Sequence, residues 1–532
     1  MPLEDSLINE DGRRSRPVRP QVTTNVRQAR DDLLSTPVAE QDSRATSRAM
    51  STRRRAETED SEKAGRVWAR GVDDPWWPCI LSLDGGGIRG YSSMLILKAL
   101  MHEVWLCERR LEAEEELPAV TRQGNPVVAE SSGSNRDENS GEAAKLTSKF
   151  TSEDDLLPCH YFDFMYGTST GGLIATILGR LRMTVPEGLE LYRKVGDDLF
   201  GTQRSRIPLR TKYHHQPLER AVQEVVGSRC IDHEDCDGKD DLHPWDTEHF
   251  REILQQQVPF DVDRPSVTQS CCLTATHDEN LSEAHLLRSY PHYYSDTSPN
   301  WITRYNEGAD ELPIWKVTRA TSAAPFYFEM VRHKVNGVET AYKDGGIREN
   351  NPTGAALSEF HALYDGKAHQ PALMLSVGTG RPDQTQDGFA IAWPGPFGKI
   401  PFVAKFLEKR AIVQNLLIKY TEGEKQHHQM REFAHGEHIW YKRLNVSSGL
   451  ETMPLDDWRK GEWQGQASVP GGASLTHMET VTAQYLDRAF DSKVDSYAPP
   501  STMLRQAAEK LVRQRRAREL EGGERWQTFI GR

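Results

Sequence analysis

The stretch Tyr161 to Leu178, YFDFMYGTSTGGLIATIL, constrains the fold of this chain more than any other. Its first part is short and aromatic, which is typical of a buried strand, and the part from Leu173 onward is apolar and suits a helix. Ser169 lies between them, so we expect it at a strand-to-helix corner with a strained backbone. A serine at the tip of such a turn has the exposure that a nucleophile needs.

The neighbours of Ser169 fit a tight turn. Gly167 and Gly171 leave space for the chain and for an approaching substrate, and Thr168 and Thr170 flank the serine directly. The helix that follows would point its positive end at Ser169 and favour negative charge there. A lone G-x-S-x-G also occurs in loops without a chemical role, so the other motifs decide its interpretation.

A second motif, LSLDGGGIRGY at 81–91, is an alternating apolar strand that ends at Asp84 and enters a glycine-rich turn. The turn consists of Gly85, Gly86, Gly87, Ile88, Arg89 and Gly90. Backbone amides near Gly86 and Gly87 would be bare enough to hold the oxyanion of a tetrahedral intermediate, with Arg89 adding positive charge.

The same turn also satisfies the dinucleotide-binding pattern G-x-G-x-x-G at Gly85, Gly87 and Gly90. That site needs an acidic residue at the end of a second strand about 20 residues later. Here the corresponding region, MHEVWLCERRLEAEEEL, continues as a helix. The sequence therefore favours an oxyanion-binding loop over a nucleotide-binding one.

A third motif, YKDGGIRENNP at 342–352, places Asp344 after an expected strand, followed by Gly345 and Gly346. Serine is a poor nucleophile until a base removes its proton. A carboxylate on a glycine turn can reach a neighbouring loop, so Asp344 is the candidate base.

Together, and in this order, the three motifs resemble those of the patatin-like phospholipase family. DGGGIRG, GTSTGG and DGG fit the family pattern, SVGTG at 376–380 resembles a further strand and turn, and the resemblance covers roughly Pro78 to Phe490. It implies that Ser169 is the nucleophile, Asp344 the proton acceptor and residues 85–89 the oxyanion-hole loop. It also implies a Ser-Asp dyad rather than a Ser-His-Asp triad.

From the residues alone a triad stays open, because histidines lie downstream of Asp344 in the order that α/β-hydrolases use. The candidates are His427, His428, His435, His438 and His477. None lies in a glycine-flanked turn, and we expect each at the surface.

The fold that we expect is α/β, a three-layer sandwich with a central mostly parallel sheet and Ser169 in a nucleophile elbow at the carboxyl end of a strand. The resemblance implies a calcium-independent lipid acyl hydrolase of phospholipase or lysophospholipase type, with no metal and no cofactor. Its expected partners are lipid esters and, transiently, a membrane surface, and not nucleic acid. A lipid-binding protein that keeps the fold without turnover is the alternative interpretation.

The composition agrees with an enzyme outside the bilayer. The mean hydropathy is −0.66 and the net charge is −12, and no apolar run approaches the ~20 residues of a membrane helix. The first residues lack the apolar core of a signal peptide. Seven cysteines do not form a paired framework. We therefore expect a cytoplasmic protein.

Four regions are expected along the chain. Residues 1–65 form a disordered tail, and 78–385 form the catalytic core, with polar insertions at about 111–155 and 228–248. Residues 386–495 supply helical and strand elements that complete the domain, and 496–532 form a charged tail.

Three local patterns complete the predictions. Cys230, His233, Cys236 and His243 invite a zinc interpretation, but their crowded acidic surroundings favour a surface loop. Cys271 and Cys272 are expected in a buried strand. The stripe at 402–410 favours a core-facing helix, with membrane docking through Lys405 and Lys409 as the alternative.

Overall fold

The structure is a computed structural model that describes most of the chain from residue 63 onward. The described residues are 63–116, 150–230, 234–239, 260–381 and 426–531, apart from short breaks at 202–203, 205–210, 265, 267, 269, 278–282, 326, 336–337, 428, 431–439, 492–493 and 496. All of them belong to one compact unit, Thr58–Arg532. Nearly all of the expected N-terminal tail, residues 117–149 of the first insertion and the stripe at 402–410 lie outside the described residues.

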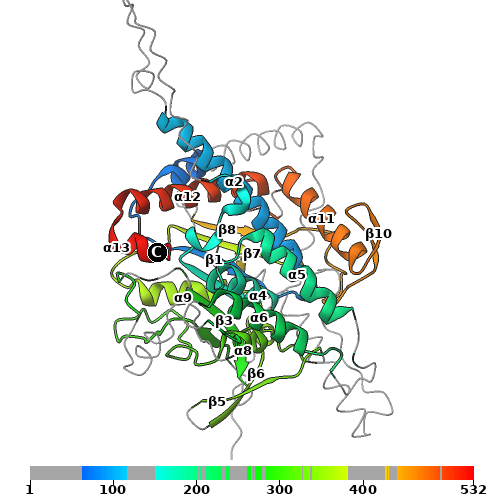
Figure 1. Ribbon diagram of the computed structural model, residues 1–532. Helices are drawn as coiled ribbons and strands as arrows, with labels where there is room; N and C mark the ends of the chain where they lie inside the picture. The colour runs from blue at the N-terminus through cyan, green and yellow to red at the C-terminus, as the bar shows by residue number, and fades with distance from the viewer. Residues whose placement is uncertain are drawn as a thin grey trace, which may run out of the picture. The chain divides into compact units, whose positions relative to one another are not determined.

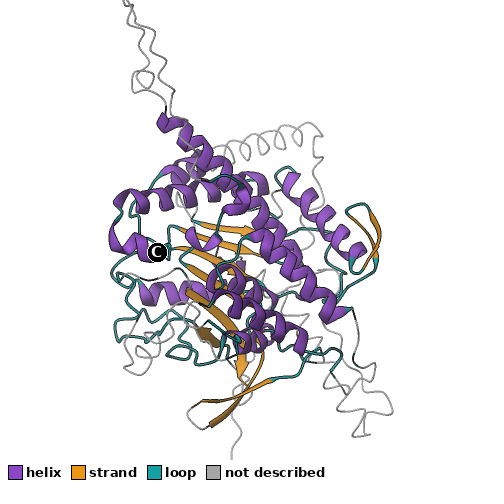
Figure 2. Ribbon diagram, in the orientation of Figure 1, coloured by secondary structure: helices purple, strands orange, loops and turns teal. Residues whose placement is uncertain are grey.

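One sheet of eight strands runs through the centre of the fold (Figure 2). Its order is β5-β6-β3-β2-β1-β7-β8, with β4 paired to β3. The strands are β1 (Cys79–Leu83), β2 (Phe164–Thr168), β3 (Ser270–His277), β4 (His285–Arg288), β5 (Val331–Val335), β6 (Val338–Asp344), β7 (Leu373–Val377) and β8 (Tyr441–Leu444). Neighbouring strands pair in parallel along the series β3, β2, β1, β7 and β8. The pairs β3–β4, β3–β6 and β5–β6 are antiparallel.

Helices surround the sheet. They are α2 (Gly90–Glu116), α4 (Thr170–Ala175), α5 (Val185–Phe200), α6 (Gln216–Arg229), α8 (Ile314–Thr321), α9 (Thr353–Leu363), α11 (Gly472–Asp487), α12 (Pro500–Glu521) and α13 (Gly523–Phe529). A separate hairpin pairs β9 (Gly461–Trp463) with β10 (Gln466–Val469). Among the described residues, no helix is long and apolar enough to cross a bilayer.

Helices cover both faces of the sheet (Figure 1). Along β2, Met165 packs into one apolar cluster together with α2, α4 and α5, whereas Phe164 and Tyr166 pack into a second cluster together with α9. Because the side chains of a strand alternate, each face has its own core. The expected three-layer α/β fold with a mostly parallel sheet is confirmed.

The local sequence explains the ends of several elements. Helix α5 begins after a capping box in which Thr184 and Glu187 each bind the backbone amide of the other. Cys271 and Cys272 lie in β3 and are buried, as expected, on opposite faces of the sheet. Helix α8 spans Ile314–Thr321 and ends before Pro325, a residue that cannot continue a helix.

The C-terminal segment differs from the charged tail that the sequence suggested. Helix α12 packs against α2 (Figure 1), and two of its arginines, Arg515 and Arg518, are buried. Arg518 donates to Asp163 at 2.9 Å, and Arg515 donates to Glu108 at 3.0 Å. Buried charges need such partners, so the density of arginine in this helix reflects pairing within the fold.

Candidate active site

Ser169 occupies the corner between β2 and α4. Its backbone has φ 53° and ψ −118°, a strained conformation for a residue with a side chain. Gly171 is required at the first turn of α4, because a Cβ there would lie 2.7 Å from the carbonyl oxygen of Asp84. The expectation of a serine at a strained strand-to-helix corner is confirmed.

The structure brings Ser169 and Asp344 together. Asp344 is the last residue of β6, and Ser169 Oγ donates a hydrogen bond to Asp344 Oδ2 at 2.7 Å. The amide of Gly346 donates to Asp344 Oδ1 at 2.7 Å, so the glycine turn holds the carboxylate in place. Burial raises the pKa of Asp344 to about 6, although both hydrogen bonds favour its charged form.

Two threonines hold the backbone of Ser169 through a chain of hydrogen bonds. The amide of Ser169 donates to Thr321 Oγ1 at 2.8 Å, and that hydroxyl donates to the carbonyl oxygen of Thr274 at 2.7 Å. Thr321 is the last residue of α8 and Thr274 lies in β3, so these contacts join the nucleophile turn to two other elements.

The glycine loop lies beside the serine, since a Cβ on Gly85 would be 3.3 Å from Ser169 Cβ. A buried ion pair anchors the start of this loop. Arg443 in β8 donates to both carboxylate oxygens of Asp84, at 2.9 and 2.6 Å. Bidentate pairs of this kind fix orientation as well as distance.

Side chains also fix the peptide planes of the loop. The carbonyl oxygen of Gly85 accepts hydrogen bonds from Thr379 Oγ1 at 2.8 Å and Asn350 Nδ2 at 3.3 Å. The carbonyl oxygen of Gly86 accepts from Arg89 Nε at 3.4 Å. In a trans peptide the next N–H points opposite to the carbonyl, so these contacts orient the amides of Gly86 and Gly87. Neither amide donates a backbone hydrogen bond to another described residue.

Arg89 differs from its expected role as a positive charge beside the oxyanion. Its guanidinium is buried and donates to the carbonyl oxygens of Gly86 and Leu450, and Arg89 is not among the residues that line the pocket. The guanidinium therefore holds the backbone of the glycine loop, because it donates to the carbonyl oxygen of Gly86 within that loop.

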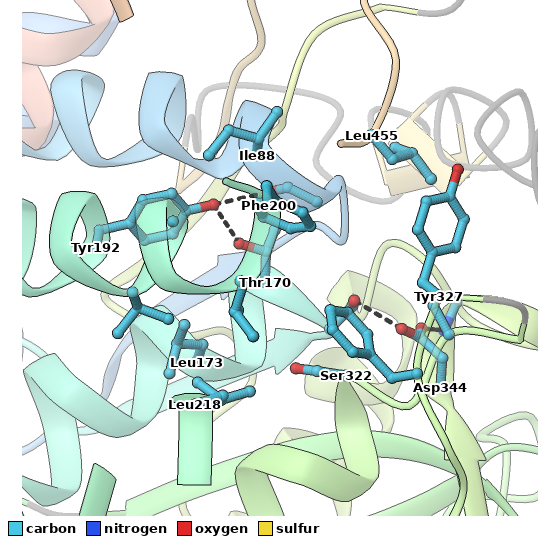
Figure 3. A pocket seen from close by; sticks show the side chains of 18 of the residues that line it. Ile88, Thr170, Leu173, Tyr192, Phe200, Leu218, Ser322, Tyr327, Asp344 and Leu455 are labelled. Atoms are coloured by element: carbon cyan, nitrogen blue, oxygen red, sulfur yellow. Dashed lines mark hydrogen bonds between the residues drawn. The ribbon is translucent and has the colours of Figure 1, made fainter. Parts of the chain in front are cut away.

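A pocket of about 900 Å³, counting open solvent at its mouth, reaches both Ser169 and Asp344. Figure 3 shows Leu173, Leu218 and Phe200 on one side of it and Tyr327 and Leu455 on the other. The wall is apolar, and polar groups gather near Ser169 at Ser322, Asp344 and Asn350. Apolar pockets with a few convergent polar groups are typical of small-molecule sites.

Histidine is absent from the described residues that line this pocket. His427 was expected at the surface, but it is buried, and its Nδ1 lies 3.0 Å from the hydroxyl of Tyr441. His477 Nε2 lies 2.7 Å from the carbonyl oxygen of Gly449. His428, His435 and His438 lie outside the described residues.

The zinc hypothesis falls mostly on residues that the structure does not describe. His233 and His243 lie outside them, while Cys230 and Cys236 are partly exposed and form no disulfide. Within the described ranges, no group of three or more histidine, cysteine or acidic residues is arranged to hold a metal ion.

Sequence reasoning missed several of the residues that build the site. Asn350 lies inside the motif at 342–352 and Thr379 lies in SVGTG, whereas Thr321 lies in none of the motifs. Arg443 and Tyr192 lie in no motif, and only their contacts in the folded chain reveal them.

A model of the patatin-like phospholipase family matches residues 143–357. This range includes Ser169 and Asp344 and begins after the glycine loop. Residues 143–357 are therefore similar to the family that the motifs resemble.

Three curated relatives illustrate the similarity. Calcium-independent phospholipase A2-gamma of Rattus norvegicus is 26% identical over 230 residues, which are 42% of this chain and 25% of that protein. The 85/88 kDa calcium-independent phospholipase A2 of the same species is 28% identical over 269 residues, 47% of this chain and 27% of that protein. "Probable inactive patatin-like protein 9" of Arabidopsis thaliana is 24% identical over 235 residues, 41% and 50% respectively. The chain thus spans about a quarter of the length of the first two relatives.

Proposed function

We propose that this chain, in which residues 143–357 are similar to the patatin-like phospholipase family, is a serine acyl hydrolase that cleaves fatty-acyl esters of lipids. The observation that carries the proposal is the 2.7 Å hydrogen bond from Ser169 Oγ to Asp344 Oδ2 inside an apolar pocket. A nucleophile within hydrogen-bond reach of its base is the arrangement that acyl transfer requires.

In the proposed reaction, Asp344 accepts the proton of Ser169 as Oγ attacks the ester carbonyl. A carboxylate with a pKa of about 6 is a stronger base than an ordinary aspartate and is still ionised at neutral pH. The amides of Gly86 and Gly87 stabilise the oxyanion. The intermediate collapses to an acyl-enzyme, the leaving alcohol takes the proton from Asp344, and water repeats the cycle to release the fatty acid.

The pocket supports a lipid ester as the substrate. Its apolar wall, which includes Leu173, Leu199 and Leu218, offers an acyl chain a dry environment, and its polar end places the ester carbonyl near Ser169. The names of the rat relatives favour a phospholipid and turnover without calcium. Phospholipid or lysophospholipid hydrolysis at a membrane surface, without metal or cofactor, is accordingly the specific form of the proposal.

The other candidate function is lipid binding without turnover. One relative carries the word inactive in its name, so a patatin-like domain does not by itself imply hydrolysis. Both Ser169 and Asp344 are present here and hydrogen-bonded, and this favours the enzyme.

The test combines a fluorophosphonate probe with fatty-acid release from phosphatidylcholine and lysophosphatidylcholine vesicles in the presence of a calcium chelator. We expect Ser169→Ala to lose labelling and release, and Asp344→Asn to lose at least about a hundredfold in both. The matched controls are Ser298→Ala and Asp310→Asn, since both residues are buried and neither lines the pocket. Release that survives in Ser169→Ala would refute the mechanism, and a folded protein that neither labels nor hydrolyses would favour the lipid-binding alternative.

A further inference from the structure

Tyr192 is a pocket residue that belongs to none of the three motifs. It lies in α5, is 6% exposed, and lines the pocket between the glycine loop and α4 (Figure 3). Its ring packs beside Tyr91 with 6.3 Å between centroids. The ring therefore contributes to the pocket wall. The hydroxyl is directed toward the glycine loop and toward the nucleophile turn, where α4 begins.

The Tyr192 hydroxyl joins those two loops through hydrogen bonds whose direction is determined. It lies 2.7 Å from the carbonyl oxygen of Gly87 and 2.6 Å from Thr170 Oγ1. A carbonyl only accepts, so Tyr192 must donate its single proton to Gly87. Thr170, the residue after the nucleophile, must then donate to Tyr192.

This contact fixes one side of the peptide between Gly87 and Ile88. The other side is held by the carbonyl oxygen of Leu455, which accepts from the amide of Ile88 at 2.8 Å. The contact also explains why position 90 is a glycine. A Cβ on Gly90 would lie 2.7 Å from the Tyr192 hydroxyl and 2.5 Å from Thr170 Oγ1. A side chain at position 90 would push the hydroxyl out of its place.

We propose that Tyr192 is a positioning residue that sets the distance between the oxyanion-binding amide of Gly87 and the nucleophile Ser169. The inference rests on the proposed hydrolase function. Loss of the contact would let the α-carbon of Gly87 shift relative to Thr170, and the Gly87 amide, which is bonded to that α-carbon, would shift away from Ser169 with it. Because such donors act on the transition state, a misplaced loop lowers kcat and leaves substrate binding by the apolar wall intact.

The first experiment is Tyr192→Phe, which keeps the ring in the pocket wall and removes only the hydroxyl. We expect kcat for vesicle hydrolysis to fall about tenfold or more, with KM changed less than about twofold, since loss of a direct oxyanion donor costs ~100-fold or more. The rate constant for fluorophosphonate labelling should fall by a similar factor. The matched control is Tyr91→Phe, whose hydroxyl donates to Glu479 at 3.0 Å and whose loss should leave both rates unchanged.

A second pair of variants tests the same contact from its other partner, Thr170, which also lines the pocket. Thr170→Val removes the donor to Tyr192 with little change of shape, and Thr170→Ser restores it. We expect Val to lower kcat, Ser to recover most of it, and Tyr192→Phe combined with Thr170→Val to lose no more than Tyr192→Phe alone. This pair decides the question if Tyr192→Phe does not fold, as judged by its thermal melting.

The outcomes separate the two proposals. If the unmodified protein neither labels at Ser169 nor releases fatty acid, the hydrolase proposal fails and this inference fails with it. If it does both while a folded Tyr192→Phe keeps its kcat and labelling rate, the hydrolase stands and the positioning role is overturned. A rise in KM at constant kcat would likewise overturn it, because that pattern indicates a wall residue only.

Discussion

Replacement of Asp344 by asparagine should make the protein more stable at neutral pH while it abolishes activity. The carboxylate is 3% exposed, and burial raises its pKa from 3.8 to about 6. Asparagine can keep both contacts, because its oxygen can accept from Gly346 and its amide can donate to Ser169 Oγ. The substitution therefore removes a buried charge without leaving an unpaired group.

The difference between the two pKa values sets the magnitude. At 1.36 kcal/mol per pH unit, the ionised carboxylate destabilises the folded state by ~3 kcal/mol once the pH is above both values. A raised carboxyl pKa means that the folded protein holds its proton to higher pH, so the wild type loses stability as the pH rises from about 4 to 6. The asparagine variant has no such loss. Its advantage should be near zero below pH 4, roughly half complete at pH 5 and full above pH 6.

Urea denaturation followed by circular dichroism at pH 5 and pH 7.5 measures this difference directly. Asp310→Asn is the matched control, because burial also raises the pKa of Asp310 to about 6, and it lies outside the pocket. It should show a similar gain in the free energy of unfolding and keep full hydrolysis. If the Asp344→Asn protein is no more stable than the wild type at pH 7.5, the argument that burial destabilises the ionised carboxylate is refuted.

Three further predictions concern the same machinery. The pH profile of kcat/KM should fall toward acid with a midpoint near pH 6, because Asp344 must be ionised to accept a proton; an unchanged rate down to pH 5 would argue against Asp344 as the base. Thr321→Val should lower the free energy of unfolding by ~1–3 kcal/mol in urea titrations, because it leaves the partly buried amide of Ser169 without an acceptor. A neutral effect would show that the threonine does not hold the corner. Arg443→Leu should lower the free energy of unfolding by ~3–5 kcal/mol, because it leaves Asp84 charged and buried without this partner. Arg459→Leu, which removes an exposed side chain that pairs with Asp457, should lower it by less than ~1 kcal/mol. Equal losses in urea titrations would contradict the role of the Asp84–Arg443 pair.

Local sequence was sufficient to predict the parts of the site that depend on local backbone geometry. A serine between Gly167 and Gly171, after an aromatic strand and before an apolar helix, has few conformations to choose from. The strained corner and the mostly parallel three-layer fold were therefore predicted and are confirmed. The roles of Ser169, Asp344 and the glycine loop stay proposals that enzymatic assays must test.

Contacts between distant segments were beyond the reach of the sequence. Asp344 lies 175 positions from Ser169, and only the folded chain brings its carboxylate to the serine hydroxyl. The C-terminal arginines were expected in a charged tail because their partners, such as Asp163 for Arg518, lie hundreds of residues away. Hydrogen bonding over such separations follows from how the elements pack, which a local pattern does not contain.

The sequence by itself determined which residues carry chemically capable groups and which turns present them. Only the tertiary structure decided what surrounds those groups: the burial that raises the pKa of Asp344, the pairing of Asp84 with Arg443, and the Tyr192 hydroxyl between two loops. Turn geometry depends on a few adjacent residues, whereas burial and hydrogen-bond partners depend on every element that packs around them.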